Sequence, residues 1–358
     1  MPPAGEPQAV LHVVQKFSSG VGSAIAHYTH SVPELAHHLL TGTAVDAEGD
    51  LAEQARFASV HRMEGGVRAK ISRIREVVRE LRPDVVHAHS SHGGAFARLA
   101  IRRTATHLVY TPHCYAFERR DVGVAVRAAF WAAEALLAVN TSAFAACSAR
   151  EWQLSAWPTR RAPRYVVPNI APPAAHAPGP RRTGTLLVAG GGRLSPQKDP
   201  EFFLASVRRL REARPGLRAV WLGDGDPVYR RPLEDGGIQV TGWLPQGPVL
   251  ELLGRADLYL HSARWEGFPL MVAEAVALGV PTLVRRVPTF DDVPAALSLA
   301  GTDLDAALAC LDDPQAAAAN LAGWAGVLAH NTPADQRAAL LDVYFRRPGH
   351  RLPPATDA

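Results

Sequence analysis

Short apolar runs alternate with helical patterns on both sides of a stretch rich in proline, glycine and alanine. That stretch, residues 171–184, has no periodicity and is typical of a linker. Alternating strands and helices build parallel sheets with helices on both faces. The sequence therefore predicts an α/β fold with two Rossmann-like doubly wound domains, residues 1–170 and 185–340, facing each other across a cleft. A tail at 341–358 follows.

The composition fits a cytoplasmic protein of two ordinary domains. The chain has 358 residues and three cysteines that lie far apart, which argues against a disulfide framework or a zinc site. The N-terminus lacks the basic and apolar regions of a signal peptide. The most apolar long stretch, residues 122–139, contains Arg127 and Glu134, so we expect a buried helix and no membrane span.

Basic residues are concentrated in the first half of the chain. Residues 1–170 carry 19 Lys and Arg against 14 Asp and Glu, whereas residues 171–358 carry 19 against 20. A basic half could contact anionic lipid at the inner face of the membrane, or it could be a solvated surface. The arginine-lined amphipathic helix at 67–81 has the same two explanations, and we favour packing on a sheet. We expect no nucleic-acid partner.

Two carboxylates, Glu266 and Glu274, flank the start of a helix in the stretch 264–284. Pro269 suits the first helical position, and the loop before it follows an apolar strand at 257–262. Ligands bind at such strand ends in open parallel sheets. Carboxylates accept paired hydroxyl hydrogens and free amides hold anions, so the site suits a phosphorylated sugar-like ligand. The amides that point out of the helix start belong to Gly267, Phe268 and Leu270.

A second candidate site is the loop that connects the strand 185–189 to the next helix, which carries two cations. Arg193 and Lys198 lie among glycines in this loop, and Asp199 is the expected N-cap of the helix. Two cations beside a helix start suit a diphosphate. The loop lacks the Gly-Lys-Ser/Thr of a Walker motif.

These motifs resemble those of GT-B glycosyltransferases, specifically the retaining family 4, or glycosyltransferase group 1. Glu266 and Glu274 match its Glu-x7-Glu signature, and Arg193 and Lys198 match its Gly-Arg-x4-Lys element. The resemblance covers nearly the whole chain and implies transfer of a sugar, most often from UDP, to a hydroxyl acceptor with retention. It implies no metal or other cofactor. Ile170 replaces the glycine of the family's Pro-Asn-Gly turn, and Asp199 stands where the family often has glycine.

The resemblance also implies residue roles. Arg193 and Lys198 would stabilise the leaving diphosphate, Glu274 would hold the ribose, and Glu266 would bind the donor sugar. His113, after the strand in HLVYTPHC, would contact the sugar or stabilise charge at the anomeric carbon, although a structural strand-end histidine is the alternative. The other residues implied in donor binding are Gly22, in a glycine loop that could equally be a tight turn, Leu244, Gly267, Phe268, Pro269 and Leu270.

Two clusters invite a metal hypothesis that we do not adopt. His87, His89 and His92 lie close in sequence, and the first two share a strand face, but no cysteine or paired carboxylate is near. Asp224 and Asp226 form an Asp-x-Asp, which in this setting resembles the family's glycine turn.

Several functions remain open. The acceptor could be a lipid-linked or other glycan in cell-envelope or exopolysaccharide assembly, or a small molecule of secondary metabolism. A UDP-sugar epimerase shares the architecture but lacks this motif set. A non-catalytic partner subunit would be expected to lack Arg193, Lys198 or Glu274, and all three are present.

Overall fold

The computed structural model describes residues 8–42, 55–171, 184–299, 301 and 303–345. It divides into two compact units, the first comprising residues 1–118, 124–170 and 331–358 and the second 119–123 and 171–330. Residues 172–183 of the predicted linker 171–184, and residues 346–358 of the predicted tail 341–358, lie outside the described residues. Residues 331–340, which we expected in the second domain, belong to the first unit.

The first unit contains a seven-stranded parallel sheet in the order β3-β2-β1-β4-β5-β6-β7. The strands are β1 Ala9–Val14, β2 Ala36–Thr41, β3 Ser59–Arg62, β4 Val85–His89, β5 His107–Thr111, β6 Ala143–Ala146 and β7 Arg164–Val166. The helices are α1 Ser19–Ser31, α3 Val67–Leu81, α4 Ser90–Ala100, α5 Val124–Ala138, α6 Ala149–Leu154 and α13 Pro333–Phe345. The strand order reverses between β1 and β4, which makes that edge the switch point where ligands bind in doubly wound sheets.

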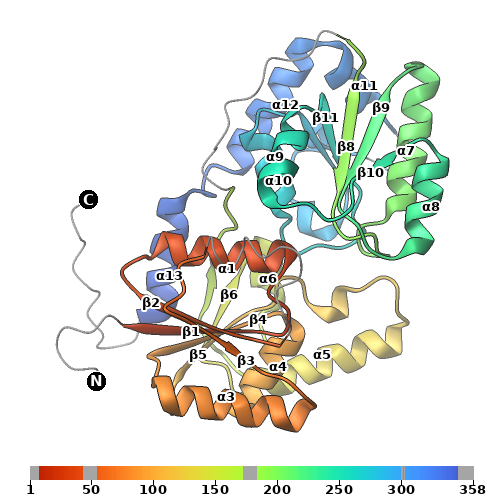
Figure 1. Cartoon of the computed structure of the whole chain (residues 1–358). Helices are drawn as coiled ribbons and strands as arrows, with labels where there is room; N and C mark the ends of the chain where they lie inside the picture. Colours follow the sequence, from red (N-terminus) through yellow and green to blue (C-terminus); the bar gives the residue numbers. More distant parts are fainter. Residues whose placement is uncertain (1–7, 43–54, 172–183, 300, 302, 346–358) are drawn as a thin grey trace. The chain divides into compact units, whose positions relative to one another are not determined.

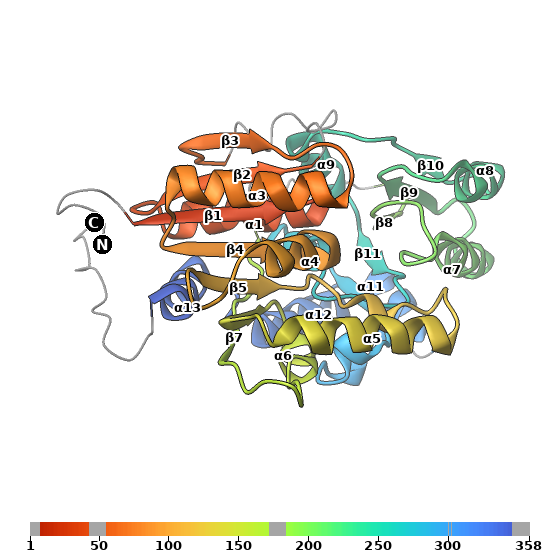
Figure 2. The ribbon, with the colours of Figure 1, turned by 90° about the horizontal axis from the view of Figure 1, so that it is seen from below.

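Helices cover both faces of this sheet. Tyr28 of α1 and Tyr344 of α13 are buried on one face, while α3 and α4 cover the other (Figures 1 and 2). Ile74 and Val77 of α3 are fully buried in the core, so its apolar side is already occupied. The basic outer face of α3 is therefore that of a helix packed on a sheet, as we expected.

The helix α5 differs from its prediction. It forms where the apolar stretch predicts a helix, but only Glu134, Ala135 and Ala138 are buried. Leu136 is 72% exposed and Val124 is 78% exposed, so the expectation of a buried helix is wrong. A narrow stripe suffices to attach α5 because Glu134 pairs with the buried Arg98, at 2.8 Å between Oε2 and Nη1.

The second unit has a six-stranded parallel sheet in the order β10-β9-β8-β11-β12-β13. Its strands are β8 Leu187–Gly191, β9 Arg218–Leu222, β10 Gln239–Val240, β11 Leu258–His261, β12 Thr282–Arg285 and β13 Ser298–Leu299. Its helices are α7 Pro200–Ala213, α8 Pro227–Asp235, α9 Gln246–Gly254, α10 Leu270–Ala277, α11 Asp305–Asp312 and α12 Pro314–Val327. Here the order reverses between β8 and β11.

The two units thus have the same strand order around their switch points, and the predicted fold of two doubly wound α/β domains is confirmed. In the second unit Phe203 and Trp221 belong to the core on one face, and Val272 and Trp324 to the core on the other. Among the described residues, no helix combines the length and apolar character needed to cross a membrane.

Candidate functional site

Strained backbone marks the carboxyl ends of several strands. Ser90 follows β4 with φ 60°, His113 and Cys114 follow β5 with φ 50° and 85°, and Asp199 follows β8 with φ 47°. Residues other than glycine rarely adopt positive φ, and such strain gathers at functional sites. Both sheets therefore carry it at the edge where ligands bind in this architecture.

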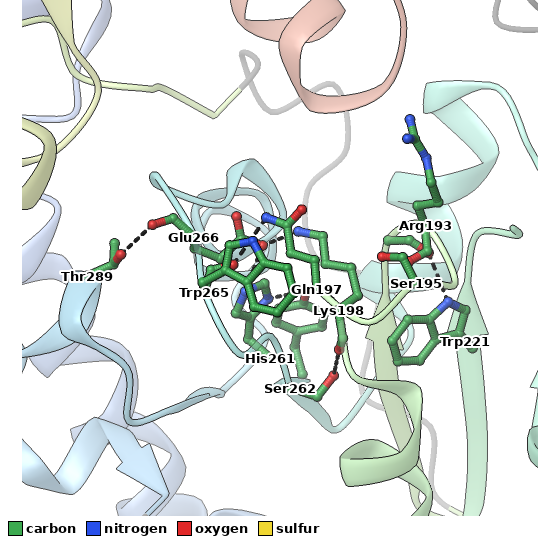
Figure 3. Close-up of polar contacts among 12 residues, drawn as sticks. Arg193, Ser195, Gln197, Lys198, Trp221, His261, Ser262, Trp265, Glu266 and Thr289 are labelled. Atoms are coloured by element: carbon green, nitrogen blue, oxygen red, sulfur yellow. Dashed lines mark hydrogen bonds and ion pairs between the residues drawn. The ribbon is translucent and has the colours of Figure 1, made fainter. Parts of the chain in front are cut away.

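Lys198 and Glu266 form an ion pair at the switch point of the second sheet. Lys198 lies in the loop after β8, and Glu266 in the loop after β11, whose strands are neighbours. The two loops are joined further, as Figure 3 shows: Ser262 Oγ donates to the Lys198 carbonyl at 2.6 Å, and Gln197 Nε2 donates to the Trp265 carbonyl at 3.1 Å. The structure thus brings together two residues that are 68 positions apart and were predicted to share a site.

Glu266 is buried yet ionised. Burial by itself would raise its pKa, but the charge of Lys198 and the neighbouring His261 lower the pKa to about 2. His261 Nε2 lies 3.5 Å from Glu266 Oε1, and His261 Nδ1 lies 3.1 Å from the Tyr259 hydroxyl. Burial lowers the pKa of His261, so the imidazole is neutral near pH 7. Sequence reasoning missed His261, because a histidine that ends an apolar strand gives no local sign of facing a carboxylate five positions later.

Glu274 is the second buried carboxyl, on α10. Burial raises its pKa to about 7, although a hydrogen bond with Gln246 acts in the opposite direction. Among the described residues it has no ion-pair partner. The pKa values of the two glutamates of the motif are therefore shifted in opposite directions, down for Glu266 and up for Glu274.

The start of α10 differs slightly from its prediction. Pro269 is the N-cap, with extended backbone at φ −77° and ψ 121°, and Leu270 is the first helical residue. The expectation that Pro269 opens the helix is wrong by one position. Leu270 is in the first turn, so its amide has no carbonyl within the helix to bind.

Arg193 lies in the same loop as Lys198, but its side chain is exposed and points away from the ion pair (Figure 3). Asp199 has a left-handed backbone conformation and stands where glycine is common in the family that the chain resembles. Its side chain accepts a hydrogen bond from the Phe202 amide at 3.2 Å and pairs with Arg285 at 2.5 Å. These two contacts compensate for the strain that a glycine would avoid.

His113 lies in the first unit, in the strained turn after β5. The turn is held by the buried Glu151, which accepts hydrogen bonds from the amides of Cys114 and Cys147, the latter at 3.0 Å. His113 Nε2 lies 3.2 Å from His89 Nδ1. Two contacts therefore fix the orientation of His113, which the sequence analysis selected. Glu151 holds the turn of its backbone, and His89 contacts its ring.

Gly22 and Leu244 were also predicted to bind the donor. Gly22 is in the first turn of α1, where its amide donates to the Ser18 carbonyl at 3.1 Å, so its assignment to a glycine loop is wrong. The loop ends at Ser18 instead. Leu244 is half-buried just before α9, in the second unit.

The metal candidates have structural partners. His12, His87 and His89 place ring nitrogens within 4.8 Å of one another. The nitrogens of His87 bond to the Tyr344 hydroxyl at 2.8 Å and the Thr111 hydroxyl at 2.7 Å. His92 is exposed on α4 and lies outside this group. In the second unit, Asp224 pairs with Arg230 at 2.9 Å and Asp226 caps α8.

Comparison with known proteins assigns both units to one class. Residues 19–170 match a family described as glycosyl transferase 4-like domain, and residues 185–324 match one described as glycosyl transferases group 1. The chain is 22% identical to an uncharacterized 41.2 kDa protein in the cps region of Klebsiella pneumoniae, over 79% of this chain and 82% of that protein.

Two further proteins are similar. One is the UDP-Gal:alpha-D-GlcNAc-diphosphoundecaprenol alpha-1,3-galactosyltransferase of Escherichia coli, at 25% identity over 57% of this chain and 58% of that enzyme. The other is the crystal structure of Anabaena HepE in complex with UDP-glucose, at a TM-score of 0.76 and 16% identity, covering 93% of this chain and 99% of HepE. The likeness to HepE shows the fold.

Proposed function

Since this chain is a glycosyltransferase with the GT-B fold, we propose that it is a retaining family 4 enzyme that transfers a sugar from a UDP-sugar to a hydroxyl acceptor. The observation that carries the proposal is the Lys198–Glu266 pair at the switch point of the second sheet. The name of the Escherichia coli relative specifies UDP-galactose, and HepE was solved with UDP-glucose. Both support a UDP-sugar as donor.

Lys198 is the proposed anchor of the donor diphosphate. A lysine ammonium has three donors, so Lys198 can keep Glu266 and still hold phosphate oxygens. Arg193 supplies a second cation, and the amides of Gly267, Phe268 and Leu270 add donors at the start of α10. As the sugar leaves, negative charge grows on the diphosphate, and these fixed donors stabilise it.

Carboxylates hold the hydroxyl groups of the donor. Glu274 binds the ribose, Leu244 lies against the base, and Glu266 binds the transferred sugar together with the loop through Pro269. The resemblance gives His113 a contact with the same sugar. The family resemblance supports these roles, and the burial of Glu266 and Glu274 fits them, because a buried carboxylate keeps its hydrogen bonds free from competition with water.

The reaction needs no covalent enzyme intermediate. The bond between the anomeric carbon and the diphosphate oxygen breaks, and the acceptor oxygen bonds to the same face of that carbon. The proton of the acceptor hydroxyl passes to the departing phosphate oxygen, so atoms and charge balance. We propose that no metal takes part, with Lys198 and Arg193 supplying the positive charge.

A lipid-linked or glycan acceptor in cell-envelope or exopolysaccharide assembly is the proposed partner. The names of both bacterial relatives support it, since one refers to a cps region and the other to a diphosphoundecaprenol. Such an acceptor calls for contact with the inner face of the membrane. The exposed apolar side chains of α5, among them Trp131 and Leu136, suit this contact, and Arg103 beside its C-terminus suits anionic lipid.

Nucleotide binding tests the proposal. We expect UDP, added without metal, to raise the melting temperature of the protein more than GDP, ADP or NAD does at the same concentration, because a ligand of the native state stabilises it. At one hundred times the dissociation constant, the effect is about 2.7 kcal/mol. No shift with any of the four would refute the assignment of the donor site.

Lys198→Ala tests the diphosphate contact. Titration calorimetry should show a loss of UDP affinity on the order of tenfold to a hundredfold, since charge-assisted hydrogen bonds contribute about 1.5–3 kcal/mol each. Arg231→Ala is the matched control, because Arg231 is an exposed cation of the same unit with only a long ion pair of 3.9 Å to Asp235. Equal affinities in all three proteins would contradict the role of Lys198.

A further inference from the structure

Four histidines are hydrogen bonded in series across the first sheet. His113 Nε2 lies 3.2 Å from His89 Nδ1, and His89 Nε2 lies 3.0 Å from His12 Nδ1. His12 Nε2 lies 3.0 Å from His37 Nδ1, and His37 Nε2 lies 3.0 Å from the carbonyl oxygen of Val32. We call these four residues the histidine row.

The sheet itself places the row. β2, β1, β4 and β5 are adjacent, and side chains two positions apart in a strand share a face. His37 pairs in register with Val10, two residues before His12, and His12 pairs with His87, two residues before His89. His37, His12 and His89 are buried, at 0–1% exposure, under the face that α1 and α13 cover.

One end of the row fixes its direction. A carbonyl oxygen only accepts hydrogen bonds, so His37 Nε2 must carry a proton and, in a neutral ring, His37 Nδ1 must accept one. The same reasoning passes along the row: His12 donates through Nε2 and accepts through Nδ1, and so does His89. His113 must then donate through Nε2, which leaves its Nδ1 without a proton.

We infer that His37, His12 and His89 are positioning residues that hold His113 in a single tautomer, with Nδ1 as a bare hydrogen-bond acceptor. Among the described residues, no group forms a hydrogen bond with that Nδ1, whereas Nε2 contacts His89. The burial that surrounds the row keeps it neutral, because desolvation lowers the pKa of His37 and of His113 to about 4.

The row does not conduct protons. Moving a proton along it would require the last ring to give its Nε2 proton to the Val32 carbonyl, which is far too weak a base to take one. The row therefore sets orientation and tautomer only. This separates it from a relay in which a buried histidine accepts charge during the reaction.

The inference rests on the proposed function for its chemical meaning. A bare Nδ1 on His113 selects a ligand group that donates a hydrogen bond, which for a sugar is a hydroxyl. His113 should thus recognise the hydroxyl of the transferred sugar as an acceptor, and it cannot use Nδ1 to donate to a sugar oxygen. A ligand that presents only an acceptor at this position should be rejected.

Nitrogen NMR of histidine-labelled protein tests the tautomer without any substrate. The shifts of protonated and bare ring nitrogens are well separated, and a His113→Gln spectrum assigns the signals of His113. In the unmodified protein we expect a proton on Nε2 and none on Nδ1. A protonated Nδ1 on His113 would overturn the inference directly.

Two substitutions at His37 test the control by the row. His37→Gln keeps a donor for Val32 and an acceptor for His12, so His113 should retain its tautomer. His37→Leu removes both, so the row can reverse and His113 should show a mixture of tautomers. An unchanged His113 signal in folded His37→Leu protein would show that the row does not set the tautomer.

Turnover separates this inference from the proposed function. With UDP-galactose or UDP-glucose as donor, His37→Leu should lower kcat about tenfold, the effect of one hydrogen bond, with UDP affinity unchanged, and His37→Gln should stay near the original rate. Loss of UDP affinity in His37→Leu would indicate general damage and contradict a positioning role. If the unmodified protein binds no UDP, the proposed function fails, while the NMR result still decides the tautomer.

Discussion

Replacing Glu274 by glutamine should stabilise the protein while it weakens nucleotide binding. Burial raises the pKa of this carboxyl from 4.5 to about 7. Each pKa unit corresponds to about 1.36 kcal/mol, so holding the ionised group in the folded state costs about 3 kcal/mol above pH 7. Glutamine has nearly the same shape and carries no charge. Glu274→Gln should therefore unfold at higher temperature than the original protein at pH 8.

The difference must depend on pH in one direction. A carboxyl whose pKa is raised on folding contributes its full stability below about pH 4.5, where it is protonated in both states. That contribution declines as pH rises and is lost above about pH 7. We therefore expect the advantage of Glu274→Gln to be small at pH 4.5 and to grow to about 3 kcal/mol by pH 8. Denaturant melts at several pH values measure this, with Glu201→Gln, an exposed acid of the same unit, as control.

The same substitution should reduce UDP affinity by roughly tenfold or more, since it removes charge-assisted hydrogen bonds to the ribose. In the original protein, binding of UDP-glucose, whose phosphates do not titrate near neutrality, should release a proton near pH 7, because hydroxyl donors favour the ionised carboxylate. Calorimetry in buffers of different ionisation enthalpy detects that proton. If Glu274→Gln lowers stability equally at pH 4.5 and pH 8, Glu274 is not the desolvated carboxyl described above, and this reasoning is refuted.

Two further predictions concern the first unit. Glu134→Ala should reduce the free energy of unfolding by about 3–5 kcal/mol, because it leaves the buried Arg98 without its ion-pair partner. The control Glu76→Ala breaks an exposed pair and should change the free energy of unfolding by less than about 1 kcal/mol. Equal losses for the two variants on denaturant melts would contradict the prediction. Leu136→Glu should reduce sedimentation of the protein with vesicles of phosphatidylcholine and phosphatidylglycerol, because it places a charge on the exposed apolar side of α5. Unchanged sedimentation, or a protein that never sediments with these vesicles, would remove the case for membrane contact.

Hydrophobic patterning predicts the fold well because both sheets are buried. Parallel strands covered on both faces appear as continuous apolar runs, which is why β1, β4, β8 and β11 are evident in the sequence. The edge strand β3 is half exposed and short, and it escaped prediction. So did α8, because Pro232 lies inside it and a helix of nine residues with an internal proline has little sequence signal.

The exposure of α5 shows what composition cannot predict. An apolar composition does not indicate whether another part of the protein packs against the helix, and in α5 only a stripe through Glu134 and Ala138 is buried. The sequence also contains no sign that the two charged residues of this helix turn inward. Arg127 donates to the Phe117 carbonyl at 2.8 Å, and Glu134 pairs with Arg98.

The candidate site could be predicted residue by residue where a motif is local, and not where it depends on packing. Lys198 and Glu266 each belong to a loop with a recognisable pattern, so their meeting follows from the strand order. His261 and the histidine row have no such pattern, because their roles arise from side chains that meet across neighbouring strands. His12 and His37 lie in strands whose sequence alone shows only apolar runs with histidines.

The contrast between the two glutamates follows from which loop reaches each of them. Glu266 precedes α10 and meets Lys198 from the loop after β8, so its pKa falls to about 2 and it is a permanent anion. Glu274 is inside the helix, beyond the reach of that lysine, and burial is the largest influence on its pKa of about 7. Ligand binding can therefore change the protonation of Glu274 but not that of Glu266. UDP-glucose separates this effect from the titration of a terminal phosphate, because both of its phosphate groups are esterified. The pH dependence of UDP-glucose binding near neutrality should disappear in Glu274→Gln and persist in Lys198→Ala.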